Sequence, residues 1–127
     1  MVMRWGVVAF FLPCAVLADP TLECPDAGSQ VEIGACVSDM ENRVNIAVET
    51  AYSLAQNAAA ELDDVTGRVV AQPALEASQV AWTAYRDAQC EAVGASFGGG
   101  SGTGIGITAC RVELGRARVD ELLSLAD

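Results

Sequence analysis

The chain has 127 residues, 52% of them hydrophobic, and 17 acidic residues stand against seven basic ones, all arginine, with no histidine. The formal net charge of −10 excludes the cationic surface that nucleic-acid phosphates require. Without histidine the chain lacks the usual general base of hydrolytic triads, so we expect a protein that is not an enzyme.

Residues 1–18 have the pattern of a secretory signal peptide. Arg4 precedes the apolar run 5–17, and the small residue Ala18 closes it. The run is shorter than the roughly 20 residues that a membrane-spanning helix needs. We therefore expect cleavage after Ala18, a periplasmic or secreted protein, and no transmembrane span in the mature form. A proline directly before Cys14 argues against a lipoprotein acylated at that cysteine.

Cleavage would leave residues 19–127 as a single domain with four cysteines, Cys24, Cys36, Cys90 and Cys110. An even number of cysteines in an exported chain is typical of disulfides. Zinc is disfavoured because the chain has no histidine and no C-x-x-C pair, and we expect neither a metal nor a cofactor. Among the possible pairings we favour Cys24 with Cys36 and Cys90 with Cys110, since each pair brackets a short segment rich in turn-forming residues.

The first elements are predicted from prolines and capping patterns. Two prolines in residues 19–28 predict an extended lead-in. The capping box Ser29-x-x-Glu32 then predicts a short N-terminal helix that reaches Cys36.

A second capping box, Ser38-x-x-Glu41, predicts the start of the first main helix, over about 39–62. Apolar residues recur there every three or four positions, as on one face of an amphipathic helix. That face consists of Met40, Val44, Ala47, Ala51, Leu54, Ala55, Ala58 and Leu62.

Two further helices follow. Residues 63–72 form a connection, and Pro73 suits the first turn of a second main helix over about 73–93. Seven glycines in residues 94–106 predict a flexible loop, and a last main helix is expected over about 107–125. No segment alternates apolar and polar residues, so the predicted fold is all-α, a small disulfide-stapled bundle of these helices.

The second helix carries one mixed stripe. Its members fall within about 80° on a helical wheel, and they are Leu75, Gln79, Trp82, Arg86, Cys90 and Val93. An inward stripe requires a partner for Arg86, and Glu121 is our preferred one because it shares a line with Cys110 on the last helix. The alternative is that the long side chain of Arg86 reaches past Trp82 to solvent.

These residues also carry a family likeness. The run Gln79-x-x-Trp82-x-x-Tyr85-Arg86-Asp87-x-x-Cys90, followed by a glycine loop and then by Cys110, Leu114, Arg118 and Leu122, resembles the lysozyme-inhibitor LprI-like N-terminal domain family. Two departures stand out. Gly115 lies where the family tends to have threonine, and Glu49 where it often has asparagine. A glycine inside a helix costs about 1 kcal/mol relative to alanine, or marks a close approach of backbones.

The resemblance implies an exported or envelope-attached binding module of the LprI lysozyme-inhibitor type. Residues 19–127 hold six arginines and 17 acids, a net charge of −11, which favours a cationic protein partner such as lysozyme. The alternative is that this charge serves only to keep an exported protein soluble. The residues with a framework or interaction role would be Gln79, Trp82, Tyr85, Arg86, Asp87, Arg118 and Glu121. The alternative is a structural or accessory envelope protein that has an endogenous protein partner and no lysozyme role.

Overall fold

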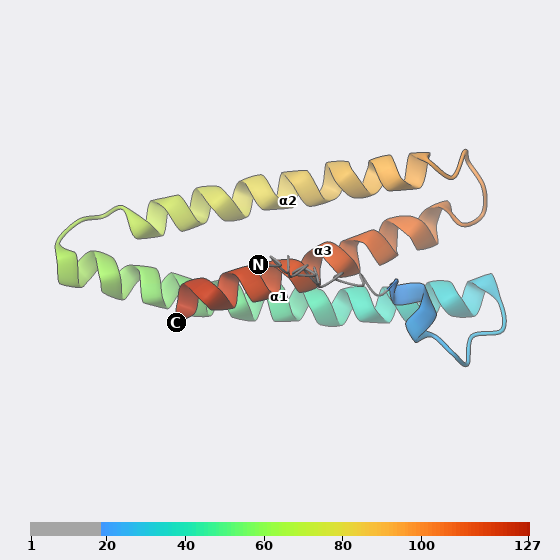
Figure 1. Cartoon of the computed structure of the whole chain (residues 1–127), viewed down its shortest axis with the longest axis horizontal. Helices are drawn as coiled ribbons and strands as arrows, with labels where there is room; N and C mark the ends of the chain where they lie inside the picture. The colour runs from blue at the N-terminus through green and yellow to red at the C-terminus, as the bar shows by residue number, and fades with distance from the viewer. Residues whose placement is uncertain (1–18) are drawn as a thin grey trace, which may run out of the picture.

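The computed structural model describes residues 19–127, and within that range it contains helices and no strands. A short 3-10 helix, η1 (Pro20–Glu23), precedes α1 (Gln30–Thr66), α2 (Ala71–Ala95) and α3 (Thr103–Ala126) (Figure 1). Helix α2 runs back along α1, and α3 returns beside both and packs more extensively on α1. The predicted all-α bundle is confirmed. No helix within residues 19–127 is long and apolar enough to cross a membrane, and the predicted signal peptide lies outside the described residues.

Helix α1 replaces two predicted elements. The Ser29 hydroxyl accepts a hydrogen bond from the Glu32 backbone N–H at 3.3 Å, and the Glu32 carboxylate accepts one from the Gly28 N–H at 2.7 Å. The first capping box therefore starts a helix as predicted. That helix does not stop at Cys36, so the separate short N-terminal helix is wrong. No glycine or proline follows Cys36 before Ser38, and the ladder of backbone hydrogen bonds continues through the second capping box.

The turn between α1 and α2 is organised by one buried carboxylate. Helix α1 ends at Gly67, which adopts the left-handed conformation with φ 66°. Val70, at the start of α2, provides no side-chain cap. Instead Asp63, which is only 5% exposed, accepts hydrogen bonds from the backbone N–H groups of Val70, Ala71 and Gln72 at 2.8 to 3.1 Å. These bonds satisfy the free donors at the N-terminus of α2.

The Asp63 cap predicts a pH dependence of stability. The hydrogen bond from Gln72, followed by those from Ala71 and Val70, lowers the pKa of Asp63 below 3.8 against the opposing effect of burial. Its stabilising contribution is therefore complete above that value and is lost as the pH falls through the lower pKa of the folded state. Asp63→Ala is expected to destabilise the protein more at about pH 7 than at about pH 2, measured by chemical denaturation. The matched control is Asp64→Ala, at an exposed neighbour; equal losses from both variants would contradict the cap.

The glycine-rich segment is more helical than predicted. Helix α2 extends through Gly94, and α3 begins at Thr103, so the connection is only residues 96–102. A Cβ on Gly94 would lie 2.5 Å from Ile107, and one on Gly106 would lie 2.5 Å from the Phe97 ring. Gly94 allows α2 to lie close to α3, and Gly106 leaves room for the Phe97 ring of the connection. The prediction of one flexible loop over 94–106 is therefore wrong at both ends.

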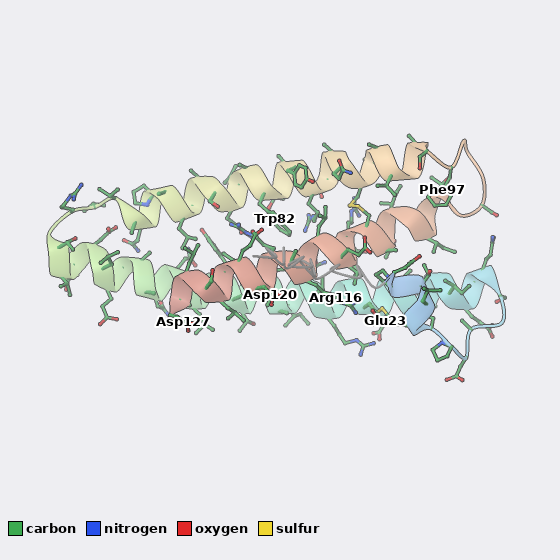
Figure 2. The ribbon with its side chains drawn as sticks, viewed as in Figure 1. Glu23, Trp82, Phe97, Arg116, Asp120 and Asp127 are labelled. Atoms are coloured by element: carbon green, nitrogen blue, oxygen red, sulfur yellow. A yellow bond between two sulfur atoms is a disulfide. The ribbon has the colours of Figure 1, made fainter. Side chains whose placement is uncertain are left out.

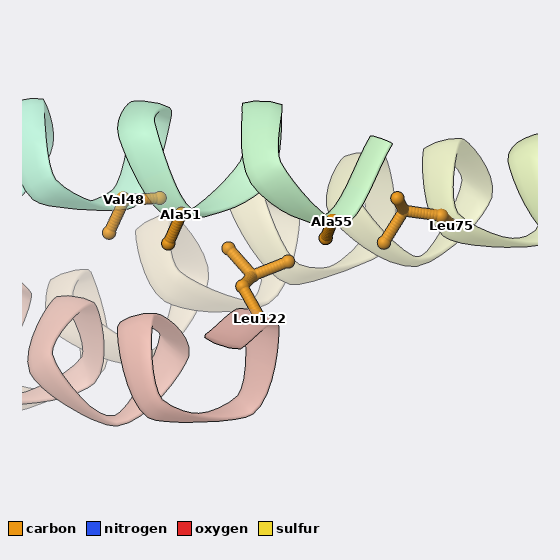
Figure 3. Packing of buried hydrophobic residues seen from close by; sticks show 5 residues of the cluster. All are labelled: Val48, Ala51, Ala55, Leu75 and Leu122. Atoms are coloured by element: carbon orange, nitrogen blue, oxygen red, sulfur yellow. The ribbon is translucent and has the colours of Figure 1, made fainter. Parts of the chain in front are cut away.

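The central core joins all three long helices. Val48, Ala51 and Ala55 of α1 surround Leu122 of α3, with Leu75 of α2 beside them (Figure 3). The face predicted for α1 is partly right, since Val44, Ala51 and Ala55 are buried, but Leu54 and Leu62 are 48% and 55% exposed. Val37 and Val48, which the prediction omitted, are in the core.

The inward face of α3 also differs from the predicted line. Glu121, which was predicted to lie inward on the line of Cys110, is exposed, whereas Arg118 and Leu122 are buried. Leu122 lies about 120° around the helix from Cys110, at about 100° per residue. Helix α3 packs mainly on α1, whereas Cys110 is joined to α2 by its disulfide. The buried side of α3 is therefore wider than the row of residues through Cys110, and it faces in a different direction.

Gly115 of α3 lies directly against Val44 of α1. A Cβ there would lie 2.5 Å from Cγ1 of the buried Val44. We expect Gly115→Ala to destabilise the protein, because overpacking costs about 1 to 3 kcal/mol and the gain in helix propensity returns only about 1 kcal/mol. Gly104→Ala is the control, since a Cβ at that helical glycine meets nothing within 4 Å.

Thermal unfolding of both glycine variants, of Val44→Ala and of Val44→Ala/Gly115→Ala measures the effect. The double variant should be more stable than the sum of its two single losses predicts. Additive losses, or a Gly115→Ala protein as stable as Gly104→Ala, would contradict this account of the interface.

Candidate binding site

A wide hollow lies at the disulfide end of the bundle. It is a groove of about 560 Å³ bordered by η1, the N-terminal turns of α1, the second half of α2 and the start of α3. Its lining is mostly apolar and includes Ile33, Val93, Ile105 and Leu114. Two aromatic residues, Tyr85 and Phe97, also line it, and Phe97 lies at the turn between α2 and α3 (Figure 2).

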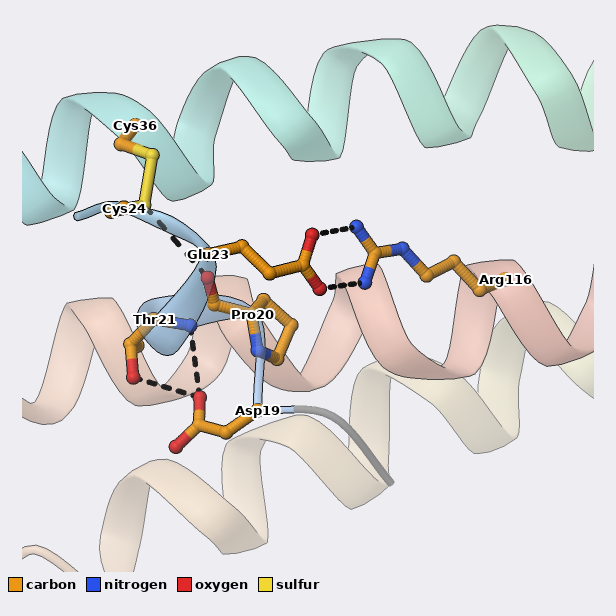
Figure 4. A network of polar contacts seen from close by, with 7 residues as sticks. All are labelled: Asp19, Pro20, Thr21, Glu23, Cys24, Cys36 and Arg116. Carbon is orange, nitrogen blue, oxygen red and sulfur yellow. Dashed lines mark hydrogen bonds and ion pairs between the residues drawn. A yellow bond between two sulfur atoms is a disulfide. The ribbon is translucent and has the colours of Figure 1, made fainter. Parts of the chain in front are cut away.

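Two disulfides hold the elements that border this groove. Cys90 is joined to Cys110, which links α2 to α3, and Cys110 itself lines the groove. Cys24 is joined to Cys36, which links the segment after η1 to α1 (Figure 4). This is the pairing that the cysteine spacing favoured.

The η1 segment is also held by polar contacts. Pro20 starts the 3-10 turn, and the Asp19 carboxylate accepts hydrogen bonds from the backbone N–H and the hydroxyl of Thr21 at 2.9 and 2.8 Å. Glu23 and Arg116 form a two-pronged ion pair, at 2.5 and 2.9 Å, that ties η1 to α3 (Figure 4). The extended lead-in predicted for 19–28 is therefore wrong over Pro20–Glu23, because proline is well tolerated in the first turn of a helix.

Glu113 is the acidic residue of α3 that lines the groove. Burial raises the pKa of its carboxyl group, the negative charge of Asp19 raises it further, and Arg116 opposes the shift. Asp19 is the other charged residue in the lining. Asp19 and Glu113 therefore place two acidic side chains among the residues that line this apolar hollow.

The second polar feature is a cluster around Trp82, which points from α2 toward α3 (Figure 2). Arg118 is 6% exposed, and its guanidinium donates to Gln79 and Ser78 of α2 at 3.0 Å and to Glu121 at 2.9 Å. Its Cζ lies 5.7 Å from the centroid of the Trp82 ring. A buried guanidinium with every nitrogen engaged fixes the register of α3 against α2.

The predicted ion pair between Arg86 and Glu121 is wrong. Arg86 pairs with its neighbour Asp87 at 2.9 Å and lies over the Trp82 ring, 5.1 Å from its centroid. Glu121 instead pairs with Arg118, three residues earlier on the same helix. The prediction failed because it placed the buried side of α3 on the wrong residues. The arginine buried between α2 and α3 is Arg118 of α3, and not Arg86 of α2.

The remaining predicted residues separate into two places. Gln79, Trp82, Arg86, Arg118 and Glu121 lie in the Trp82 cluster, where Arg118 makes the contacts that join α3 to Gln79 and Trp82 of α2. Tyr85 lies on the groove and is 55% exposed.

Sequence reasoning missed three contributors to the groove, Asp19, Phe97 and Glu113. The one available signal was the spacing of Glu113, three residues after Cys110, which places both on neighbouring sides of one helix. Within residues 19–127 no group of three or more His, Cys, Asp or Glu side chains is arranged to hold a metal ion.

Comparisons with known proteins show a protein family and an individual protein to which the chain is similar. A family model described as "Lysozyme inhibitor LprI" matches residues 23–122, which include the last residue of η1, all of α1 and α2, and α3 as far as Leu122. A protein of Rhizobium meliloti (strain 1021), described as uncharacterized, is 31% identical over 113 residues, which are 85% of this chain and 81% of that protein. No solved structure matches the chain.

Proposed function

Because the chain belongs to the LprI lysozyme-inhibitor family, we propose that it is a non-catalytic binding module of the cell envelope that binds and inhibits a cationic lysozyme. The observation that carries this proposal is the family match over residues 23–122. The surplus of acidic residues supports it, since 17 acids and seven arginines give a formal charge of −10. A strongly negative surface attracts a cationic protein over distances longer than direct contact.

Export is part of the same proposal. Two disulfides within residues 19–127 suit an oxidising compartment such as the periplasm. The apolar run 5–17 after Arg4 would supply the signal, with cleavage after Ala18. Sequencing the N-terminus of the protein isolated from the envelope fraction tests this step, with Asp19 expected as the first residue.

Inhibition is tested with the purified, fully oxidised protein and a C-type lysozyme acting on a bacterial cell suspension. We expect the rate of clearing to fall as the protein is added in excess, and the effect to weaken when salt is raised from about 0.05 to about 0.5 M. An unrelated acidic protein of the same net charge is the control for charge alone. Unchanged lysis in excess protein would remove the inhibitor function.

A second candidate is an accessory envelope protein with an endogenous partner. It is favoured by an apolar notch of about 340 Å³ at the opposite end of the bundle, where α3 ends before the hairpin of α1 and α2 does. Leu62 and Leu125 line this notch and are more than half exposed. Recovery of one stable partner by crosslinking in the native envelope, combined with unchanged lysozyme activity, would favour this function.

A further inference from the structure

We propose that the groove at the disulfide end is the contact surface of this protein, and that it receives a cationic side chain flanked by apolar residues of a protein partner. The inference rests on the proposed function and adds to it the location and the chemistry of binding. The occupant to which the structure points is an arginine or lysine on a protruding segment of a basic protein.

The apolar part of the argument concerns the groove lining. Ile33, Val93, Ile105 and Leu114 surround a hollow of about 560 Å³, which is large enough for side chains of a partner. Tyr85 and Phe97 are 55% and 50% exposed on the same groove. Aromatic side chains in a pocket with apolar walls are the residues that most often dominate binding energy at protein interfaces.

The electrostatic part concerns the two acids. Asp19 and Glu113 have the charged side chains of the lining, and both side chains are negative. After the proposed cleavage Asp19 would also carry the α-ammonium group, so the negative charge offered to a partner is that of Glu113. Among the described residues, Glu113 has no ion-pair or hydrogen-bond partner for its carboxylate. Arg116 lies near it but is engaged by both oxygens of Glu23. A partly desolvated carboxylate without a partner interacts more strongly with an incoming cation than one in open water does.

The groove is also held in shape before any partner arrives. The Cys90–Cys110 bridge joins α2 to α3, the Cys24–Cys36 bridge fixes the segment after η1, and the Glu23–Arg116 pair ties η1 to α3. A surface that is already ordered loses less conformational entropy on binding. The notch at the other end of the bundle is lined mostly by small and aliphatic residues without a charge, so it fits a cationic side chain less well.

Variants of the groove test the proposal against C-type lysozyme. Glu113→Gln removes the charge while keeping the shape, and Tyr85→Ala removes an exposed aromatic ring. Each is expected to weaken binding about tenfold in a calorimetric or surface-binding titration. The matched control is Glu76→Gln, which removes one exposed charge from α2 outside the groove and should change affinity by less than about twofold. Glu113→Gln should fold at least as stably as the natural chain, because burial opposes ionisation of Glu113.

The possible results of these titrations distinguish the assignment of the groove as the contact surface from the proposed inhibition of lysozyme. If the natural chain binds lysozyme and both groove variants bind equally well, the groove assignment is overturned and the inhibitor function stands. If the natural chain does not bind lysozyme, the proposed function fails, and a peptide probe then decides on the groove. The probe is acetyl-Leu-Arg-Leu-amide, followed through backbone amide chemical shifts in NMR spectra.

Shifts confined to residues such as Gln89, Val93, Ile105 and Leu114, and reduced by Glu113→Gln, would support the groove. The control peptide acetyl-Leu-Gln-Leu-amide has the same apolar flanks without the charge. Equal shifts with both peptides, or shifts spread over the whole surface, would overturn the assignment.

Discussion

Replacing Leu122 by alanine is expected to lower the free energy of unfolding by about 2 to 5 kcal/mol. Leu122 has no exposed surface and lies where α3 packs against Val48, Ala51 and Ala55 of α1 (Figure 3). Two of these neighbours are alanines, whose short side chains cannot move to fill the space that the lost isobutyl group would leave. The loss therefore includes a cavity as well as the transfer of apolar surface to water.

The adjacent residue supplies the control. Leu123 is 40% exposed, so Leu123→Ala removes the same atoms from the same helix without opening the core. Urea denaturation at neutral pH should show a large loss for Leu122→Ala and a loss below about 1 kcal/mol for Leu123→Ala. Similar midpoints for the two variants would mean that α3 faces α1 with a different side.

Removing the Cys90–Cys110 bridge is the second large effect. The two cysteines are 20 residues apart, and closing a loop of that length stabilises a folded chain by about 3 kcal/mol in the chain-entropy model. We expect Cys90→Ala/Cys110→Ala to lose about that much free energy of unfolding, since both residues are buried and alanine introduces no buried polar group. Thermal unfolding of the oxidised proteins measures the loss.

The same variant links stability to the groove. Cys110 lines the groove and joins its α3 wall to α2, so breaking the bridge should also loosen the residues around Phe97 and speed their amide hydrogen exchange. Cys24→Ala/Cys36→Ala is the comparison, because its bridge lies outside the connection between α2 and α3. Unchanged exchange around Phe97 after loss of the Cys90–Cys110 bridge would show that the loop is held by packing alone.

Glycine explains one class of difference between the predicted and the observed structure. The absence of a Cβ permits both flexible loops and close helix contacts, so composition alone does not distinguish them. Gly98 and Gly99 have positive φ and serve the turn, whereas Gly94 and Gly106 lie in helices against Ile107 and Phe97. Whether a glycine serves a turn or a close helix contact depends on the residues packed against it, and these come from another part of the chain.

The stripe on α2 was predictable because it is narrow. Leu75 and Cys90 are buried and Gln79, Trp82 and Arg86 are half-buried, as one inward line requires. Helix α3 packs on α2 and far more extensively on α1 than α2 does, so its buried side is too wide to be located from periodicity. For that reason the prediction paired Glu121 with Arg86, whereas its partner in the structure is Arg118.

The amino-acid sequence by itself determined the helical class, the start of α1 at Ser29, the inward line of α2 and the cysteine pairs that close short segments. These features depend on residues close together in the chain, where periodicity and capping act. Only the tertiary structure decided which side of α3 is buried, that Asp63 caps the next helix, and that Asp19 and Glu113 meet in one groove. Those features depend on how the helices lie against one another, and that arrangement is set by contacts between residues distant in the sequence.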